Sequence, residues 1–143
     1  MVWEHSWRPV SPLTGLSTLS DEVTWLIRLS RAPYYDEQLT QGLDVALACG
    51  AFGQSAVVVL EGLAVGALNA NQLAPTGEAN LFKQLSAMPL YDIERIYCLA
   101  NDDDNDVAEF NADTHDIEGL AIETITTERW HQLVANAKHV LNF

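Results

Sequence analysis

The chain has 143 residues, of which 48% are hydrophobic and 19% charged, and this composition predicts one globular domain rather than a disordered chain. Seven Lys and Arg residues against twenty Asp and Glu residues give a formal net charge of −13. Such a charge repels phosphate backbones and disfavours direct binding of nucleic acid. The longest apolar run, Ala56–Leu60, is far shorter than a membrane span, so no membrane association is predicted.

Residues 1–22 form the first segment, which we expect to be an irregular N-terminal extension to a single α/β domain at 23–143. Two prolines and a glycine interrupt any hydrophobic period there. Trp3 and Trp7 are costly to leave in water, so they either pack onto the domain or a neighbouring subunit or belong to a partly ordered terminus. The first residues lack the basic start and apolar core of a signal peptide, and we expect a cytoplasmic protein.

The first predicted strand, Val23–Ser30, is rich in β-branched and aromatic residues. A turn follows, in which Asp36 is a candidate N-cap for a helix over residues 37–52. The apolar positions of this helix form a broad buried stripe, and Gly50 and Gly53 are expected to end it.

The second predicted strand, Gln54–Glu61, contains the continuous apolar run noted above. Strands with this pattern are covered on both faces, which favours a parallel sheet between two helical layers. Gly62 is expected to make a tight turn into a short helical or looped connection. A helix over 78–88 then ends before Pro89, because proline restricts the residue that precedes it.

The third predicted strand, Ile93–Ala100, is followed by an acidic loop at 101–106. The remaining pattern predicts one helical turn and three regular elements: a turn at 107–110, a strand at Leu120–Ile125, a helix capped by Thr126 or Thr127, and a strand at His139–Phe143. This alternation predicts an α/β fold, a three-layer α/β/α sandwich with a mostly parallel five-stranded sheet.

The carboxyl ends of parallel strands are the usual place for ligand or catalytic groups. Three predicted segments fall there: Ser30–Pro33, Gly62 and Cys98–Asp102. No glycine-rich nucleotide fingerprint is present, and the histidines are scattered. The acidic loop lacks the glycine and terminal glutamate of a calcium loop, so it predicts a solvated loop. We therefore predict neither a cofactor nor a metal.

The two cysteines, which show no CxxC spacing, differ in their predicted surroundings. Cys49 lies late in the first helix and is expected to pack as a small hydrophobic residue. Cys98 lies near the end of a strand, where backbone N–H groups can favour a thiolate. The aspartates that follow it oppose this and raise the thiol pKa. The residues alone leave two alternatives open, a buried structural cysteine, which they favour, and a reactive thiol.

Four motifs together carry a family resemblance: Ser30-Arg31-Ala32-Pro33, Gly42-Leu43-Asp44, Phe82-Lys83-Gln84-Leu85 and Leu90-Tyr91-Asp92-Ile93-Glu94. In their order and spacing the chain resembles the DsrE/DsrF-like sulfur-relay family, most closely its TusC (DsrF) branch. The apolar C-terminal strand ending on Phe143 fits the same branch.

The resemblance implies a cytoplasmic subunit of a hetero-oligomer of the TusBCD/DsrEFH type, built from related α/β chains. Such assemblies pass persulfide sulfur from donor to acceptor proteins, toward 2-thiouridine formation in tRNA or toward sulfur oxidation. In them the TusD branch carries the relay cysteine, whereas TusC-type chains contribute assembly. The partners implied are related chains, in a homo- or hetero-oligomer, together with sulfur-donor and acceptor proteins.

Three functions follow as expectations. The first is an assembly subunit in which Cys98 is inert. The second is a sulfurtransferase-type persulfide carrier that uses Cys98, because this residue falls where the TusD carrier cysteine lies and Asn69–Leu73 resembles a TusD segment. The third is a small-molecule-binding domain that uses the strand ends.

Overall fold

A computed structural model describes residues 23–99 and 117–143 of the chain. The expected N-terminal extension at 1–22, the acidic loop at 101–106 and the helical turn at 107–110 lie outside these residues.

The described part of the chain is built on one five-stranded sheet with the strand order β4-β3-β2-β1-β5. All four neighbouring pairs are parallel. The strands are β1 (Val23–Leu29), β2 (Ala56–Glu61), β3 (Arg95–Leu99), β4 (Ala121–Ile125) and β5 (Ala137–Asn142). The predicted parallel five-stranded α/β fold is confirmed.

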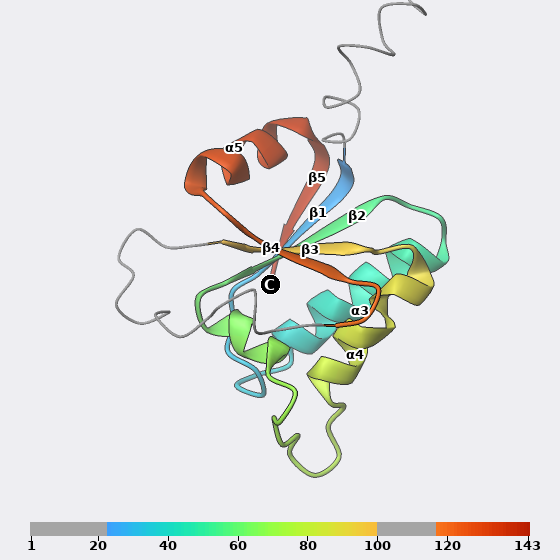
Figure 1. The fold of residues 1–143 in the computed structure, drawn as a ribbon, viewed down its shortest axis with the longest axis vertical. Helices are drawn as coiled ribbons and strands as arrows, with labels where there is room; N and C mark the ends of the chain where they lie inside the picture. Colours follow the sequence, from blue (N-terminus) through green and yellow to red (C-terminus); the bar gives the residue numbers. More distant parts are fainter. Residues whose placement is uncertain (1–22, 100–116) are drawn as a thin grey trace, which may run out of the picture.

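Helices cover both faces of the sheet, and the direction of the connections explains which face each one covers (Figure 1). The chain steps from β1 to β2 to β3 in one direction across the sheet, so right-handed crossovers place these connections on the same face. The connection from β4 back to β5 runs the opposite way and crosses the other face. The first face carries α3 (Gln38–Ala51), η1 (Gly62–Leu68), α4 (Leu81–Ala87) and η2 (Met88–Tyr91), and the second carries α5 (Thr127–Asn136).

The core consists of two clusters, one on each face of the sheet. Alternation along β3 shows the division, because Ile96 and Cys98 belong to the cluster beneath α3 and α4, whereas Tyr97 and Leu99 belong to the cluster beneath α5. The larger cluster includes Ile27, Leu29, Leu43, Leu60, Leu68, Leu85 and Met88. The smaller consists of Leu26, Val59, Tyr97, Leu99, Ile125 and Leu133.

The ends of α3 differ from the sequence prediction. Glu37 is the N-cap residue but makes no side-chain cap, and the Asp36 carboxylate instead accepts the Gln38 N–H at 2.9 Å. The prediction that Gly50 ends the helix was wrong, because α3 continues to Ala51. Gly53 follows with a φ of +71°, a conformation that glycine adopts without strain.

The other helix ends agree better with their local signals. Thr126 caps α5 by accepting the Arg129 N–H at 3.2 Å, as predicted. Helix α4 is shorter than predicted because the Asn80 side chain caps it, accepting the Lys83 N–H at 3.1 Å. Pro89 does not break the chain's helical path but lies in the first turn of η2, where no N–H is needed.

Candidate functional site at the carboxyl ends of the strands

Cys98 is the penultimate residue of β3, in the middle of the three strands β4, β3 and β2. It lies beside Leu60 of β2 and Thr124 of β4 in the sheet register. Its side chain is 2% exposed and belongs to the cluster beneath α3 and α4. The predicted position near a strand end is therefore correct, and the residue is buried.

Burial raises the pKa of the Cys98 thiol to about 12. The thiolate fraction at pH 7 is then on the order of one part in 10⁵. The aspartates of the 101–106 loop, from which a raised pKa was expected, lie outside the described residues. Loss of hydration is the cause that the structure supplies. In this arrangement Cys98 is a poor nucleophile.

Cys49 lies near the end of α3, is partly buried, and is also a free thiol. Burial raises the pKa of Cys49, and a backbone hydrogen bond partly offsets that effect. The residue packs less completely than the sequence analysis expected of a small hydrophobic side chain, and it lies away from the carboxyl ends of the strands.

Tyr34 connects the loops that follow β1 and η1 through hydrogen bonds of its hydroxyl group. Its backbone has a φ of +62°, an uncommon conformation for a residue other than glycine. Its hydroxyl donates to the Gln72 side-chain oxygen and accepts the Leu81 N–H at 3.2 Å. The Gln72 amide nitrogen in turn donates to the carbonyl oxygens of Ala67 at 2.8 Å and Asn69 at 2.7 Å. One hydroxyl thus joins three segments that are distant in the sequence.

The hydrogen bond between Tyr34 and Gln72 was not predicted from the sequence, because neither residue belongs to a local pattern. The only signal was the resemblance of Asn69–Leu73 to a TusD segment. Gly62 behaves as predicted, because its φ of +58° allows the tight turn from β2 into η1. Pro33 lies against Gly66, where an added Cβ would be 3.4 Å from the proline ring. Two of the predicted strand-end segments, the Ser30–Pro33 turn and the connection after Gly62, therefore meet at one edge.

An ion pair lies on the opposite face of the sheet at the same end. Arg28 of β1 donates to Glu61 of β2, and its guanidinium carbon lies 5.5 Å from the centre of the Trp130 ring in α5. Because the pair is partly buried and held by an aromatic ring, it stabilises packing of α5 on the sheet. These residues were not predicted as part of a site, although charges within otherwise apolar strands were the available signal.

Three large apolar side chains at this end are exposed, namely Tyr35 in the turn after β1, Leu63 in η1 and Leu73 in the loop after η1. Leu73 has a relative exposure of 90% and directly follows Gln72. These three residues and the loops joined by Tyr34 are called the carboxyl-end surface below. Large exposed apolar side chains that gather on one surface mark an interaction site more often than an enzyme pocket.

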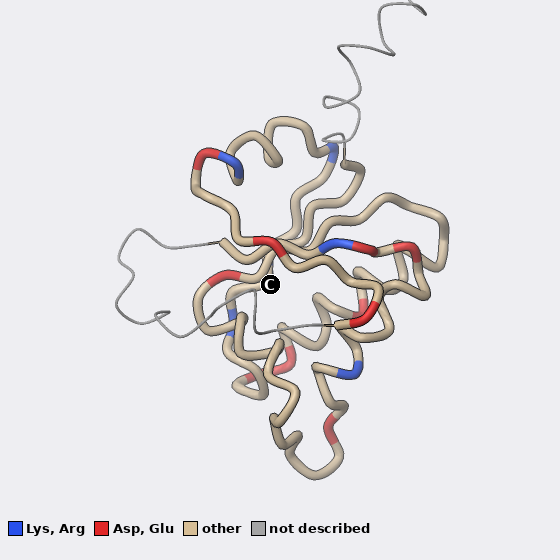
Figure 2. The backbone as a smooth tube through the Cα atoms, viewed as in Figure 1, with Lys and Arg blue, Asp and Glu red and all other residues tan. Residues whose placement is uncertain are grey.

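The described residues contain no group of three or more His, Cys, Asp and Glu side chains that could hold a metal ion. Acidic side chains outnumber basic ones over the described backbone (Figure 2). None of the helices within 23–99 and 117–143 has the length and hydropathy required to cross a membrane.

Comparison with protein families gives a match to the DsrE/DsrF-like family over residues 25–143. The chain belongs to the DsrE/DsrF-like family. Comparison with curated proteins returned no match. Among solved structures, the YchN protein from E. coli is similar to this DsrE/DsrF-like chain, with a TM-score of 0.68 and 22% sequence identity, covering 85% of this chain and 99% of YchN. At that identity the likeness concerns the fold.

The family membership confirms the resemblance found in the sequence and fits a sulfur-relay-related role. Membership alone does not assign this DsrE/DsrF-like chain to the TusC branch, which stays a prediction. The geometry adds what the family does not specify, namely a buried thiol at the expected strand end and an apolar surface beside it.

Proposed function

We propose that this chain is an assembly subunit, rather than the sulfur carrier, of an intracellular persulfide-transfer complex of the TusBCD/DsrEFH type. Such a complex serves 2-thiouridine formation in tRNA or sulfur oxidation. The observation that carries the proposal is the burial of Cys98, with 2% of its side chain exposed and its pKa raised to about 12.

A persulfide relay needs a thiolate that can reach its partner. The thiolate attacks the outer sulfur of a donor persulfide, the sulfur–sulfur bond of the donor breaks, and the donor leaves as a thiolate. Cys98 meets neither requirement in this structure, because its proton is held by burial and its sulfur is covered by the core beneath α3 and α4. The carrier of the complex is therefore a related chain.

The carboxyl-end surface is the part of the chain that we assign to these related chains. Its exposed residues Leu63 and Leu73 flank a segment whose conformation the Tyr34 hydroxyl fixes through Gln72. A fixed apolar surface loses little conformational entropy on binding, which favours stable association. In the TusD branch the carrier cysteine lies at the end of a central strand, so an interface at this end would lie close to a partner's relay thiol.

The experiment is co-expression of this chain with the related DsrE/DsrF-like chains of its source, followed by size-exclusion chromatography with light scattering. The native chain is expected to elute in a stable complex, and the double variant Leu63→Ser/Leu73→Ser to elute alone. Val134→Ser, on α5, is the matched control and should leave the complex intact. A strictly monomeric native chain that recruits no related chain contradicts the proposal.

The alternative function is that Cys98 is itself the persulfide carrier, and its position near the end of a central strand favours it. This function needs the packing that covers Cys98 to open so that the sulfur becomes accessible. Alkylation with iodoacetamide at pH 7.5 separates the two functions, because a carrier thiol must react in the folded chain at least as fast as Cys49. The assembly function predicts that Cys98 reacts only after the chain is unfolded in urea.

A further inference from the structure

A second exposed apolar cluster lies at the opposite end of the sheet, where the strands begin. Phe52 ends α3 and is 83% exposed, and Leu90 of η2 is 84% exposed. Helix α3 packs so closely on η2 that a Cβ added to Gly50 would overlap the Tyr91 carbonyl oxygen and lie 2.8 Å from the Tyr91 Cβ. This close approach places Tyr91 against the last turn of α3, which Phe52 follows in the chain.

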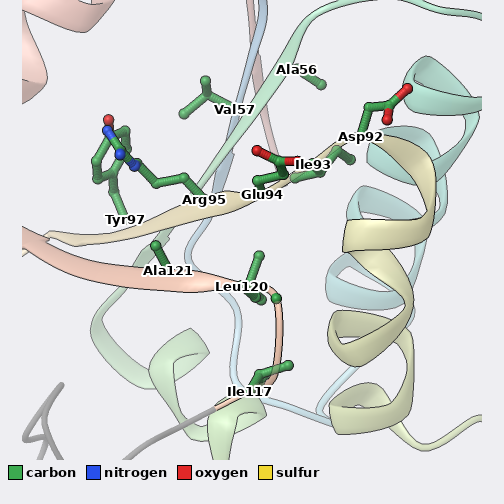
Figure 3. A pocket seen from close by; sticks show the side chains of 11 residues that line it. Ala56, Val57, Asp92, Ile93, Glu94, Arg95, Tyr97, Ile117, Leu120 and Ala121 are labelled. Atoms are coloured by element: carbon green, nitrogen blue, oxygen red, sulfur yellow. The ribbon is translucent and has the colours of Figure 1, made fainter.

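A hollow of about 620 Å³ lies at the same end of the sheet (Figure 3). The first residues of three strands line it, Ala56 of β2, Arg95 of β3 and Ala121 of β4. Asp92 and Glu94 also line it, and Asp92 directly follows Tyr91 in the chain. Together they are called the amino-end surface.

The amino-end surface is open because the second face of the sheet is incompletely covered in the described residues. Helix α5 packs mainly against β1 and β5. The starts of β3 and β4 on that face have no described helix above them, and Arg95 and Glu123 form an exposed ion pair there at 3.9 Å. Parallel sheets are normally covered on both faces, so a covering segment is to be expected.

We propose that residues 1–22 of the same chain cover the amino-end surface, with Trp3 and Trp7 as the anchoring side chains. This segment joins the domain at Val23, the first residue of β1, which lies at the same end of the sheet. Strand β3 is two strands away from β1, or roughly 10 Å. Trp7 precedes Val23 by sixteen residues, a length that extends to roughly 50 Å, so the segment reaches the hollow easily.

The chemistry of the segment fits the surface better than that of a second copy. Residues 1–22 contain one basic residue, Arg8, and three acidic residues, Glu4, Asp21 and Glu22, of which the last two directly precede β1; the part that carries both tryptophans, residues 1–20, has no net charge, whereas the whole chain carries −13. This neutral part of the segment approaches Asp92 and Glu94 without the repulsion that another acidic domain would meet. An indole ring packs well over a guanidinium such as that of Arg95, and tethering keeps the segment at a high effective concentration.

Hydrogen exchange measured by mass spectrometry tests this inference on the full chain and on a chain that begins at residue 22. Peptides that contain residues 88–95 and 117–123 are expected to exchange at least several-fold faster in the shortened chain. Peptides from 62–73, at the carboxyl end, should be unchanged. If the shortened chain fails to fold, the full-length variant Trp3→Ser/Trp7→Ser replaces it, with Trp130→Phe as the control substitution.

The dependence of hydrogen exchange on protein concentration shows whether the contact is intramolecular. Protection of the amino-end peptides that is the same over a hundredfold range of concentration supports the inference. Protection that grows with concentration together with the molecular mass assigns the surface to a second copy and overturns it. Equal exchange in the full and shortened chains also overturns it, and none of these outcomes bears on whether the carboxyl-end surface binds related chains.

Discussion

The two ends of the sheet are held together in different ways. At the carboxyl end, side-chain hydrogen bonds from Tyr34 and Gln72 connect loops that are distant in sequence, and the Arg28–Glu61 pair bridges β1 and β2. At the amino end, close backbone packing of α3 on η2 replaces such bonds, and part of the sheet stays open. The comparison shows that a surface can be fixed mainly by specific polar contacts or mainly by steric fit, and each kind responds to a different substitution.

The largest expected effect is on the pH dependence of stability, in which substitutions of the two cysteines should differ. The ordinary pKa of an unfolded thiol is ~8.5, and burial of Cys98 raises it to about 12, so the folded state binds this proton more tightly. The resulting stabilisation is fully present below pH 8.5 and is lost as the pH rises toward 12. Between pH 8.5 and pH 11 the loss is on the order of 3 kcal/mol, because each pH unit corresponds to ~1.4 kcal/mol.

The measurement is urea unfolding of the native chain and of Cys98→Ala at several pH values. The stability advantage of the native chain over Cys98→Ala should shrink and reverse as the pH rises. Cys49→Ala is the control, and its difference from the native chain should change much less. A difference for Cys98→Ala that is constant with pH would show that this thiol is not held protonated by the fold.

Substitution of two glycines of α3, Gly42 and Gly50, allows the packing at the two ends of the sheet to be compared. A Cβ at Gly50 meets the backbone of Tyr91, which cannot move aside, whereas a Cβ at Gly42 meets the side chains of Leu29 and Phe143. Overpacking costs ~1–3 kcal/mol, and the better helix propensity of alanine returns up to ~1 kcal/mol. Gly50→Ala is therefore expected to lower the free energy of unfolding by about 2 kcal/mol, and Gly42→Ala by about half as much. Urea unfolding that ranks the two variants in the reverse order contradicts the steric account of the amino end.

Removal of one hydroxyl should loosen the carboxyl end. Tyr34→Phe leaves the Gln72 side-chain oxygen and the Leu81 N–H without their partner, which costs about 1–2 kcal/mol. Faster hydrogen exchange over residues 67–81 is the expected sign, with no change over residues 88–95. Tyr35→Phe is the matched control, because that neighbouring tyrosine is exposed, and an equal effect of both variants would argue against this connection.

The smallest expected effect on stability comes from removal of one of the two ion pairs, Arg28–Glu61 and Arg95–Glu123. Glu61→Gln removes a partly buried partner of Arg28 and is expected to cost about 1 kcal/mol. Glu123→Gln removes the exposed partner of Arg95 at the amino end and should lower the free energy of unfolding by less than about 0.5 kcal/mol. At high ionic strength this small loss should disappear, because salt screens exposed charges. Thermal unfolding at low and high ionic strength compares them, and a larger loss for Glu123→Gln would mean that the amino end depends on charge rather than fit.

Local signals in the sequence predicted those parts of the fold that depend on local physics. The apolar run at Ala56–Leu60 became a central strand, and Thr126 capped the last helix. Gly50 misled the prediction because its small size serves a tertiary contact with Tyr91, which no helical pattern encodes. In the same way, the bond between Tyr34 and Gln72 joins residues 38 positions apart and leaves no local sign.

The position of the candidate site was predicted, and the residues favoured a buried structural cysteine over a reactive thiol, but they did not supply the cause of the raised pKa. The run of strand-forming residues placed Cys98 near the carboxyl end of a strand, and this was correct. Its burial depends on how η1 and α4 pack over the sheet, which only the assembled core determines. The thiol pKa consequently could not be inferred from the neighbouring aspartates.

The most direct test of the central claim is intact-mass measurement of the folded Cys49→Ala variant after incubation with a cysteine desulfurase and cysteine. A related carrier chain in the same reaction serves as the positive control. The carrier is expected to gain the mass of one sulfur atom, whereas this chain is expected to gain none. Addition of one sulfur atom to this chain, lost in Cys49→Ala/Cys98→Ala, would contradict it and make Cys98 the carrier.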